Sequence, residues 1–479
     1  MGESTLYRPE YHFAPPANWM NDPNGLVYYE GEWHLFYQYS PGRAPGSHWG
    51  HAVSTDLAHW EHLPVALAPD EAGIIASGSA VVDWNDTSGF FGGGSGLVAI
   101  YTLWKNQGRD GSDQSQSIAY SLDRGRTWTK YAGNPVLPNQ GIADFRDPKV
   151  IWHAPTRRWV MIVATFDRAT FYVSPNLRDW TYVSSFGKGQ GATGDGVWEC
   201  VDLFPLPVDG DPGRTKWVLN VSLGCASMQY FVGDFDGESF RNDNPPDLVL
   251  RSTCGPNDYA AVTWSDIPPA DGRQVWIGWM AAWGYAERVP TEGWKGVLTL
   301  PRSLALKSTT EGVRLLQTPV VEMEALRGPG QVWTDISLTP SGSFTLPAQA
   351  ESCEVIAEFD LGEADEVGIR VRKGEAEQTV IGYSRADHTV FIDRSRSGVT
   401  DFDPGFGEVK RFRVPGDGTR LKLHLFVDRS SVEVFVNSDE SYAAAVIFPS
   451  PESRTIEVTT GGGTAHLRSL QFYPLSLKW

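Results

Sequence analysis

Short apolar runs dominate the chain, and hydrophobic and polar residues alternate within them. Examples are "GLVYYEGEWHLFYQY", "GLVAIYTLW" and "RWVMIVATF", separated by stretches rich in Gly, Asn, Asp and Pro. A period of two residues, with many β-branched and aromatic residues, is typical of β-strands. Long stretches of helical periodicity are almost absent. The pattern therefore predicts an all-β protein.

A repeat of apolar strand, Ser, polar turn and Trp is visible in the first half of the chain. It reads "HAVSTDLAHW" at 51–60, "IAYSLDRGRTW" at 118–128 and "FYVSPNLRDW" at 171–180, with a degenerate copy, "YFVGDFDGESF", at 230–240. The spacing of roughly 50–70 residues suits a four-stranded propeller blade with its loops. With the closing segment "VWIGWMAAW", these copies predict a five-bladed β-propeller over residues 1–315.

The character of the sequence changes after residue 315. "TPVVEMEALRG" reads as a short helix-like segment within a linker at 316–338. Residues 339–479 then alternate cleanly, as in "CEVIAEFDL" and "RLKLHLFVDRSSVEVFVN", which predicts a two-sheet β-sandwich. A chain of 479 residues is also too long for one hydrophobic core. The expected architecture is a five-bladed β-propeller followed by a β-sandwich.

The composition narrows the range of partners. The net charge of −18 argues against binding to nucleic acid or to an anionic membrane surface. No apolar run approaches the roughly 18 residues of a membrane-spanning helix. The start, "MGESTLYRPEYHF", lacks the pattern of a signal peptide, so we expect a cytoplasmic protein or a secreted one whose signal has been removed. The 19 tryptophans suit a β-rich core, and flat apolar rings also suit sugar binding.

The sequence predicts neither a metal site nor a cofactor. "GQGATG" at 189–194 matches a dinucleotide-binding pattern but lacks the βαβ setting that this pattern requires. His48 and His51 have no suitably spaced acidic or histidine partners. The cysteines are widely scattered, which predicts free thiols. They are Cys200, Cys225, Cys254 and Cys353.

Three acidic residues stand in unusual settings: Asp22 in "NWMNDPNG", Asp147 in "FRDPKV" and Glu199 in "WECVDLF". Taken alone, each is explained as a turn residue or a surface carboxylate, because Asp-Pro and Asn-Gly favour turns. Each also lies near the start of a different repeat, so equivalent positions could converge at the propeller axis. Two carboxylates in an apolar pocket acquire different pKa values, as glycosidic bond cleavage requires.

These three segments resemble the signature blocks of glycoside hydrolase family 32, which comprises invertases, inulinases, levanases and related fructosyltransferases. Further blocks agree, including "WGHAVSTDLAHWEHLPVALAPD" at 49–70, "LPRSLAL" at 300–306 and "DRSSVEVFVN" at 428–437. The resemblance covers both predicted domains in the right order. It implies a five-bladed propeller followed by a β-sandwich, which agrees with the repeats.

The resemblance also implies roles for particular residues. Asp22 matches the nucleophile, Glu199 the general acid/base and Asp147 the residue that binds fructose hydroxyls and stabilises the transition state. Such a retaining reaction implies a separation of about 5–5.5 Å between the carboxyls of Asp22 and Glu199. The matched substrate-binding positions are Asn21, Gln38, Trp49, Ser77, Arg146 and Trp283.

The sequence departs from the family pattern around these positions. The block that holds Trp49 keeps only one of the two tryptophans usual in the family. Elsewhere Ala76 replaces an aromatic residue, Val201 a proline, Asn257 an acidic residue, and Ala281 and Ala282 two asparagines. Because they remove bulk and hydrogen-bonding groups, we expect catalysis to be retained with a different sugar, linkage or product.

Three activities remain open on the sequence. The first is hydrolysis of terminal β-D-fructofuranosyl linkages in levan, inulin or sucrose. The second is fructosyl transfer, or release of a disaccharide, by the same carboxylates, because both share a covalent intermediate. The third is a non-catalytic carbohydrate-binding propeller, which the intact carboxylate trio disfavours. The expected partner is a fructan or fructo-oligosaccharide, and the expected state is a monomer or homodimer.

Overall fold

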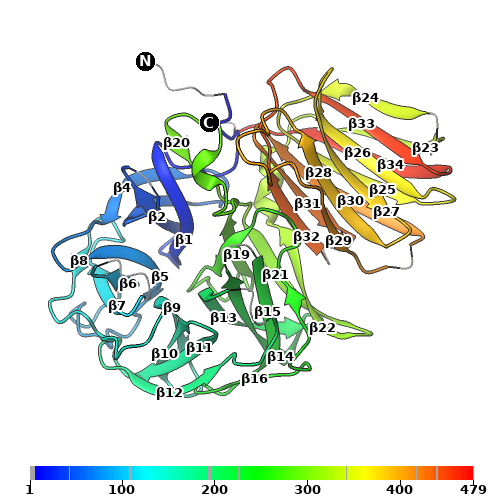
Figure 1. The fold of residues 1–479 in the computed structure, drawn as a ribbon. Coiled ribbons are helices and arrows are strands. Elements are labelled where there is room, and N and C mark those ends of the chain that lie inside the picture. The colour runs from blue at the N-terminus through cyan, green and yellow to red at the C-terminus, as the bar shows by residue number, and fades with distance from the viewer. Residues whose placement is uncertain are drawn as a thin grey trace.

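The computed structural model describes residues 6–42, 44–106, 111–192, 196–224, 227–340, 342–416, 418–437 and 441–477. The predicted all-β class is confirmed: within these ranges the only helices are two short 3₁₀ turns, η1 (Ala286–Arg288) and η2 (Val321–Leu326). Figure 1 shows a ring of sheets from blue to green and a separate layered unit from yellow to red. In the described part of the chain, no helix is long and apolar enough to span a bilayer.

The first sheet of the ring in chain order has five strands. Its strand order is β20-β1-β2-β3-β4. β1 and β2 are joined by Glu30-Gly31, and both of these residues have positive φ (47° and 88°), as a tight hairpin turn of the primed type requires. The strands are β1 (Asn18–Tyr29), β2 (Glu32–Ser40), β3 (His48–Ser54), β4 (Glu61–Leu67) and β20 (Trp294–Lys295).

Two four-stranded sheets follow, each a simple antiparallel meander. The second contains β5 (Ile74–Val82), β6 (Leu97–Trp104), β7 (Gln114–Ser121) and β8 (Thr129–Lys130). The third contains β9 (Phe145–His153), β10 (Arg158–Thr165), β11 (Arg168–Ser174) and β12 (Thr181–Phe186).

The sequence repeat marks the same turn in all three sheets. β3, β7 and β11 each end at the repeat serine, whose hydroxyl donates to the Asp or Asn two residues later. The repeat tryptophan then donates its indole N–H to the carbonyl oxygen three residues before it. These bonds run from Trp60 to Leu57, from Trp128 to Gly125 and from Trp180 to Leu177. The Ser and Trp therefore recur because they close this hairpin.

The ring is completed by a nine-stranded sheet with the main order β16-β15-β14-β13-β21-β19-β18. A single parallel pairing of Val208 with Leu306 joins its two parts. The strands are β13 (Trp198–Val208), β14 (Asp211–Leu223), β15 (Ser227–Phe235), β16 (Phe240–Asn242), β17 (Leu250–Arg251), β18 (Tyr259–Thr263), β19 (Gln274–Trp279), β21 (Arg302–Thr309) and β22 (Gly312–Pro319).

The remaining strands form two six-stranded antiparallel sheets that share one apolar core, as the sequence predicts for a sandwich. One has the order β23-β34-β25-β30-β31-β32 and the other β24-β33-β26-β27-β28-β29. Their strands are β23 (Gln331–Leu338), β24 (Ser343–Gln349), β25 (Cys353–Asp360), β26 (Glu366–Lys373), β27 (Gln378–Ser384), β28 (Thr389–Arg396), β29 (Lys410–Arg413), β30 (Arg420–Asp428), β31 (Ser431–Val436), β32 (Ser441–Val446), β33 (Thr455–Gly461) and β34 (Ala465–Pro474).

The two domains pack through a shared apolar cluster that includes Trp279 and Trp294 from the ring and Tyr442 and Phe448 from the sandwich. Asn257, one of the departures from the family pattern, lies in this interface rather than beside the three carboxylates. Its side-chain oxygen accepts hydrogen bonds from Arg394 (2.7 Å) and from the backbone N–H of Val446 (3.0 Å). This replacement therefore joins the domains and does not widen the pocket.

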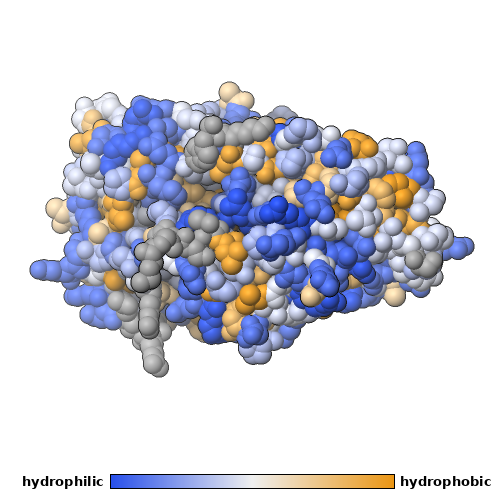
Figure 2. All heavy atoms as spheres, turned by 90° about the horizontal axis from the view of Figure 1, so that it is seen from above, coloured by the Kyte–Doolittle hydropathy of each residue, from blue (hydrophilic) through white to orange (hydrophobic). Residues whose placement is uncertain are grey.

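The face of the molecule seen in Figure 2 carries hydrophobic side chains in small groups between hydrophilic ones, which is typical of a surface that faces water. Three cysteines are free thiols, as the sequence predicts: Cys200, Cys254 and Cys353. Cys225 and part of "GQGATG", residues 193–194, lie outside the described residues.

Candidate functional site

The three carboxylates come from the first strands of three sheets: Asp22 from β1, Asp147 from β9 and Glu199 from β13. Each lies at or beside a shift in strand register, where the inner strand has one residue more than its partner. Asp-Pro suits such a β-bulge because proline has no N–H to donate to a ladder. A bulge redirects a side chain, so these shifts turn the carboxylates towards the ring axis.

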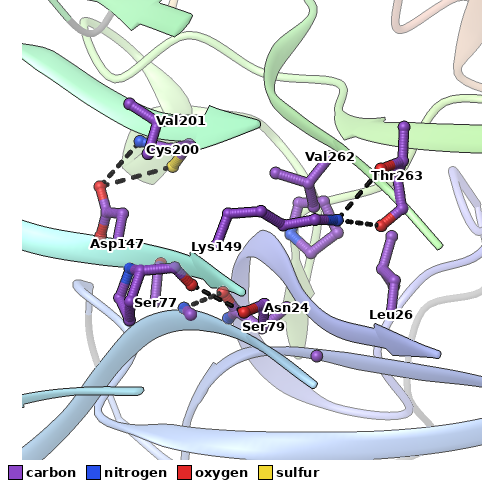
Figure 3. Close-up of a pocket in the computed structure, with 14 residues that line it drawn as sticks. Asn24, Leu26, Ser77, Ser79, Asp147, Lys149, Cys200, Val201, Val262 and Thr263 are labelled. Atoms are coloured by element: carbon purple, nitrogen blue, oxygen red, sulfur yellow. Dashed lines mark hydrogen bonds between the residues drawn. The ribbon is translucent and has the colours of Figure 1, made fainter. Parts of the chain in front are cut away.

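Cys200 lies between the two aspartates. Its sulfur is 3.6 Å from Oδ2 of Asp22 and 3.7 Å from Oδ2 of Asp147. Its backbone N–H donates to the same Oδ2 of Asp147 at 2.9 Å, as Figure 3 shows. Both Asp147 and Cys200 have positive φ, 60° and 46°. Residues other than Gly rarely adopt this backbone conformation, and in proteins it clusters at functional sites.

Asp22 is almost fully buried, with 9% of its surface exposed. Ser77 on β5 donates its hydroxyl to Oδ2 of Asp22 at 2.8 Å. Burial raises the pKa of Asp22 above its ordinary value of 3.8, the negative charge of Glu199 adds to the rise, and the Ser77 hydroxyl offsets part of it. For Asp147, burial is the largest cause of a pKa raised to about 7, with Glu199 and Asp22 adding to it and Arg146 opposing it.

Glu199 is held from two sides. Arg146 donates to Oε1 through Nη2 (3.0 Å) and Nε (3.3 Å), and Tyr259 donates its hydroxyl to Oε2. Arg146 also pairs with Asp144 at 2.5 Å. Burial by itself lowers the pKa of Arg146, but the charges of Glu199, Asp147 and Asp144 outweigh burial and raise this pKa above its ordinary value. The side chain of Glu199 keeps 17% of its surface exposed, so it is the more accessible of the proposed catalytic pair.

The predicted substrate-binding residues differ in their burial and in their contacts. Asn21 and Gln38 are buried: Oδ1 of Asn21 accepts from Trp19 Nε1 (2.7 Å), and Gln38 donates to the Ile75 carbonyl (3.2 Å). Trp283 is partly exposed and packs edge-on against Trp279, with 4.9 Å between ring centroids.

Trp49 has no exposed surface, and its indole N–H donates to the carbonyl of Ala76 at 3.0 Å. A ring without exposed surface offers no face to a sugar. Trp49 therefore acts from beneath, by supporting the backbone of Ala76.

Sequence reasoning assigned no role to several residues that the fold brings to the site. Cys200 belongs to the motif "WECVDLF", and Tyr259 lies two residues after Asn257, but neither carried a signal of contact with a carboxylate. Asn24 joins β1 to β5, since its side chain accepts from Gly78 N–H (3.1 Å) and donates to the Asp22 carbonyl (3.2 Å). Thr102 accepts the backbone N–H of Asp147 at 2.9 Å.

The two histidines considered as metal ligands have other contacts. His51 lies 3.1 Å from His34 between ring nitrogens and stacks on Phe36 with 4.0 Å between centroids. His48 Nδ1 bonds the hydroxyl of Ser47 at 2.9 Å. Across the described ranges, no cluster of three or more His, Cys, Asp or Glu side chains is arranged to hold a metal ion.

Ser77→Ala is expected to move the acid limb of kcat/KM to higher pH by about one unit. The role of nucleophile, which the resemblance implies for Asp22, requires the ionised form, so activity is expected to fall as the pH drops through the pKa of Asp22. The lost hydrogen bond stabilised the ionised form by about 1.5 kcal/mol, and its removal raises that pKa. Ser79→Ala is the matched control, because Ser79 on the same strand donates to the Pro148 carbonyl instead. An acid limb that stays in place in Ser77→Ala contradicts this assignment.

Comparisons with known proteins agree over the whole chain. Residues 12–319 match the glycosyl hydrolases family 32 N-terminal domain, and residues 322–474 match the family 32 C-terminal domain. A levanase of Bacillus subtilis (strain 168) is 53% identical over 99% of this chain and 71% of its own length. An extracellular exo-inulinase of Aspergillus awamori is 38% identical over 99% of this chain and 95% of its own. The structure of a fructofuranosidase from Schwanniomyces occidentalis complexed with fructosylnystose has a TM-score of 0.89 at 28% identity, covering 99% of both chains.

Proposed function

Because the chain belongs to the glycosyl hydrolases of family 32, we propose that it is a fructan-cleaving β-fructofuranosidase in which Asp22, Asp147 and Glu199 carry the reaction. The observation that carries this proposal is the convergence of three carboxylates from three sheets around Cys200 and Arg146. The levanase and exo-inulinase relatives support fructan as the substrate.

The reaction proceeds in two displacements. In the first, an oxygen of Asp22 attacks the anomeric C2, the bond from C2 to the leaving oxygen breaks, and the proton of Glu199 passes to that oxygen. In the second, Glu199 takes a proton from water, whose oxygen attacks C2 and releases Asp22. Asp147 binds fructose hydroxyls, and its charge stabilises the transition state. Arg146 orients Glu199 through Oε1, so the transferred proton is carried by Oε2, the oxygen that contacts the hydroxyl of Tyr259.

The remaining predicted residues form the fructose pocket in this proposal. Asn21, Gln38 and Ser77 supply polar groups near Asp22, and Trp283 supplies an aromatic face at the rim. Trp49 contributes from below through the backbone of Ala76. This retaining mechanism requires a separation of about 5–5.5 Å between the carboxyls of Asp22 and Glu199, which stays a prediction.

We also infer that the ring has five blades. Five strands have a register shift near the axis: β1, β5, β9, β13 and β18. The nine-stranded sheet then counts as two blades joined by a single pairing. Residues 1–315 form the propeller and 339–479 the sandwich in the predicted division. The stretch 316–338 between them contains the end of β22, the turn η2 and β23.

Hydrolysis of levan is the favoured activity among those left open, because the levanase relative is 53% identical. An extracellular relative favours the secreted location over the cytoplasmic one. The monomer or homodimer remains the predicted state. The retained carboxylate trio also serves fructosyl transfer or disaccharide release, so the products decide between these outcomes.

Chromatography of the products from levan, inulin and sucrose tests the function, with Glu199→Ala as the control. We expect free fructose from levan. We also expect Glu199→Ala to lower kcat on levan and sucrose by about 10²–10⁴-fold, because the leaving oxygen loses its proton donor. An activated fructoside whose leaving group needs no proton should keep most of its rate of bond cleavage in this variant. Disaccharides or longer transfer products would show that the activity is disaccharide release or fructosyl transfer and not hydrolysis to fructose. The absence of product from all three substrates would reject the proposal.

A further inference from the structure

A second cavity lies at the end of the ring axis opposite the carboxylates. Along β9, Asp147 faces the site, Lys149 lies two residues further and Trp152 lies near the other end of the strand. At about 3.3 Å per residue, Trp152 is about 16 Å from Asp147 along the strand. The lining of this cavity, here called the far cavity, includes Lys149, Trp152, Trp159, Trp217, Trp264, Ser265 and Gln274.

A buried ion pair separates the far cavity from the catalytic site. Nζ of Lys149 contacts Oδ1 of Asp202 at 3.1 Å and donates to the carbonyl (2.8 Å) and hydroxyl (3.0 Å) of Thr263. Figure 3 shows Lys149 reaching across towards Thr263. The side chains of Lys149 and Asp202 are 4% and 0% exposed. A sugar therefore cannot pass along the axis, and the far cavity is not an extension of the catalytic pocket.

The far cavity has the walls of a small-molecule site. Its volume is about 320 Å³, and four tryptophans contribute to its lining. Trp152 is 38% exposed and packs edge-on against Trp159, with 5.0 Å between centroids. Trp217 is partly exposed, whereas Trp264 is buried. Two of the aromatic rings that line the far cavity, those of Trp152 and Trp217, thus keep part of their surface exposed to solvent.

The polar groups of the far cavity suit a neutral ligand with hydroxyl groups. In the described chain, the indole N–H groups of Trp152 and Trp217 and the amide of Gln274 make no hydrogen bond, and the buried hydroxyl of Ser265 has no partner. The charged groups that line the far cavity already have hydrogen-bond partners within the protein. Asp266 accepts from Val82 N–H (2.8 Å) and Trp84 Nε1 (2.9 Å), while Lys149 is engaged as described.

We propose that the far cavity is a non-catalytic binding site for a segment of fructan chain. The inference rests on the proposed function, which supplies a neutral, polyhydroxylated polymer as the substrate. Accessible tryptophan rings match the apolar C–H faces of sugars, and their N–H groups match the hydroxyls. A second binding site on a polymer raises the local concentration of chain at the catalytic site without any new catalytic group.

Trp152→Ala and Trp217→Ala test this proposal by the ratio of kcat/KM on levan to kcat/KM on sucrose. We expect each variant to lower this ratio about tenfold through a higher KM for levan, because sucrose is too short to profit from a second site. Tyr182→Ala is the matched control: Tyr182 on β12 is 58% exposed and lies outside the far cavity. Trp152→Phe keeps an aromatic ring and should retain most of the ratio.

An unchanged ratio in both alanine variants would overturn the inference, and so would equal losses on levan and sucrose. Light scattering, which measures the mass of the particle in solution, tests the other possible occupant of the far cavity, a second copy of the chain. A mass that halves in Trp152→Ala would assign the far cavity to a dimer interface and reject the sugar site. A failure of the proposed function would give a different result from a failure of this inference, because the unsubstituted protein would then cleave neither levan nor sucrose.

Discussion

Asp22→Asn is expected to lower kcat on every fructoside by a factor on the order of 10⁶, the scale observed when a catalytic nucleophile is removed. The amide has nearly the same shape as the carboxylate and still accepts the hydrogen bond from Ser77, so the fold should persist. Without a carboxylate at this position no covalent intermediate forms. Activated substrates should therefore be lost together with natural ones, in contrast to Glu199→Ala.

The assay is initial rate on sucrose, on levan and on an activated fructoside, with thermal melting to check the fold. Asp83→Asn is the matched control. Asp83 is also buried, and it accepts from the backbone N–H groups of Thr87 and Ser88 at 2.9 and 2.8 Å, away from the site. It should keep kcat within a few-fold. If Asp22→Asn retains more than about one part in a hundred of the wild-type kcat, Asp22 is not the nucleophile.

His12→Ala is expected to lower the free energy of unfolding by about 3–5 kcal/mol, because it leaves two buried carboxylates without their cation. His12 joins the N-terminal segment to the sandwich: Nδ1 lies 2.8 Å from Asp428 and Nε2 lies 2.7 Å from Glu433. All three side chains are fully buried. Glu433 also accepts the hydroxyl of Tyr442 and the N–H of Leu300 (2.8 Å), so the loss should loosen the contact between the domains.

This contribution should depend on pH in a defined way. The hydrogen bonds and charges of Asp428 and Glu433 outweigh the effect of burial and raise the pKa of His12 to about 9, above its ordinary 6.5. The stabilisation is thus fully present below about pH 6.5 and is lost as the pH rises through 9. The pKa of Asp428 lies below its usual range through its bonds to His12 and to backbone N–H groups, despite its burial. Its own contribution is therefore lost only in strong acid.

Chemical denaturation of wild type and His12→Ala between pH 6 and pH 10 measures both effects. His59→Ala is the matched control, because His59 makes a pair of the same length, 2.8 Å, with Asp56, but the two side chains are 30% and 42% exposed. An exposed pair contributes about 0–1 kcal/mol. Equal losses in the two variants, or a difference from wild type that does not shrink towards pH 10, would contradict the assignment to His12.

The strands and the turns of this protein were readable from the sequence. Alternation along each run is a local property, and so is the Ser-to-Trp repeat, whose hydrogen bonds span only two or three residues. The Asp-Pro pairs were visible in the sequence, but they predicted turns, whereas the structure places both at bulges inside β1 and β9. A proline that cannot donate to a ladder suits either position. Three carboxylates on the first strands of three repeats could therefore be expected to converge.

The partners of those carboxylates were decided by the tertiary structure. Tyr259 reaches Glu199 from a strand 60 residues later, and Cys200 contacts Asp22 across a separation of 178 residues. Asn257 looked like a change in the pocket but lies between the domains, 137 residues from Arg394. His12 lies 421 residues from Glu433. A periodic pattern carries information over a few residues, whereas contacts such as these exist only once the sheets have closed into a ring and packed against the sandwich.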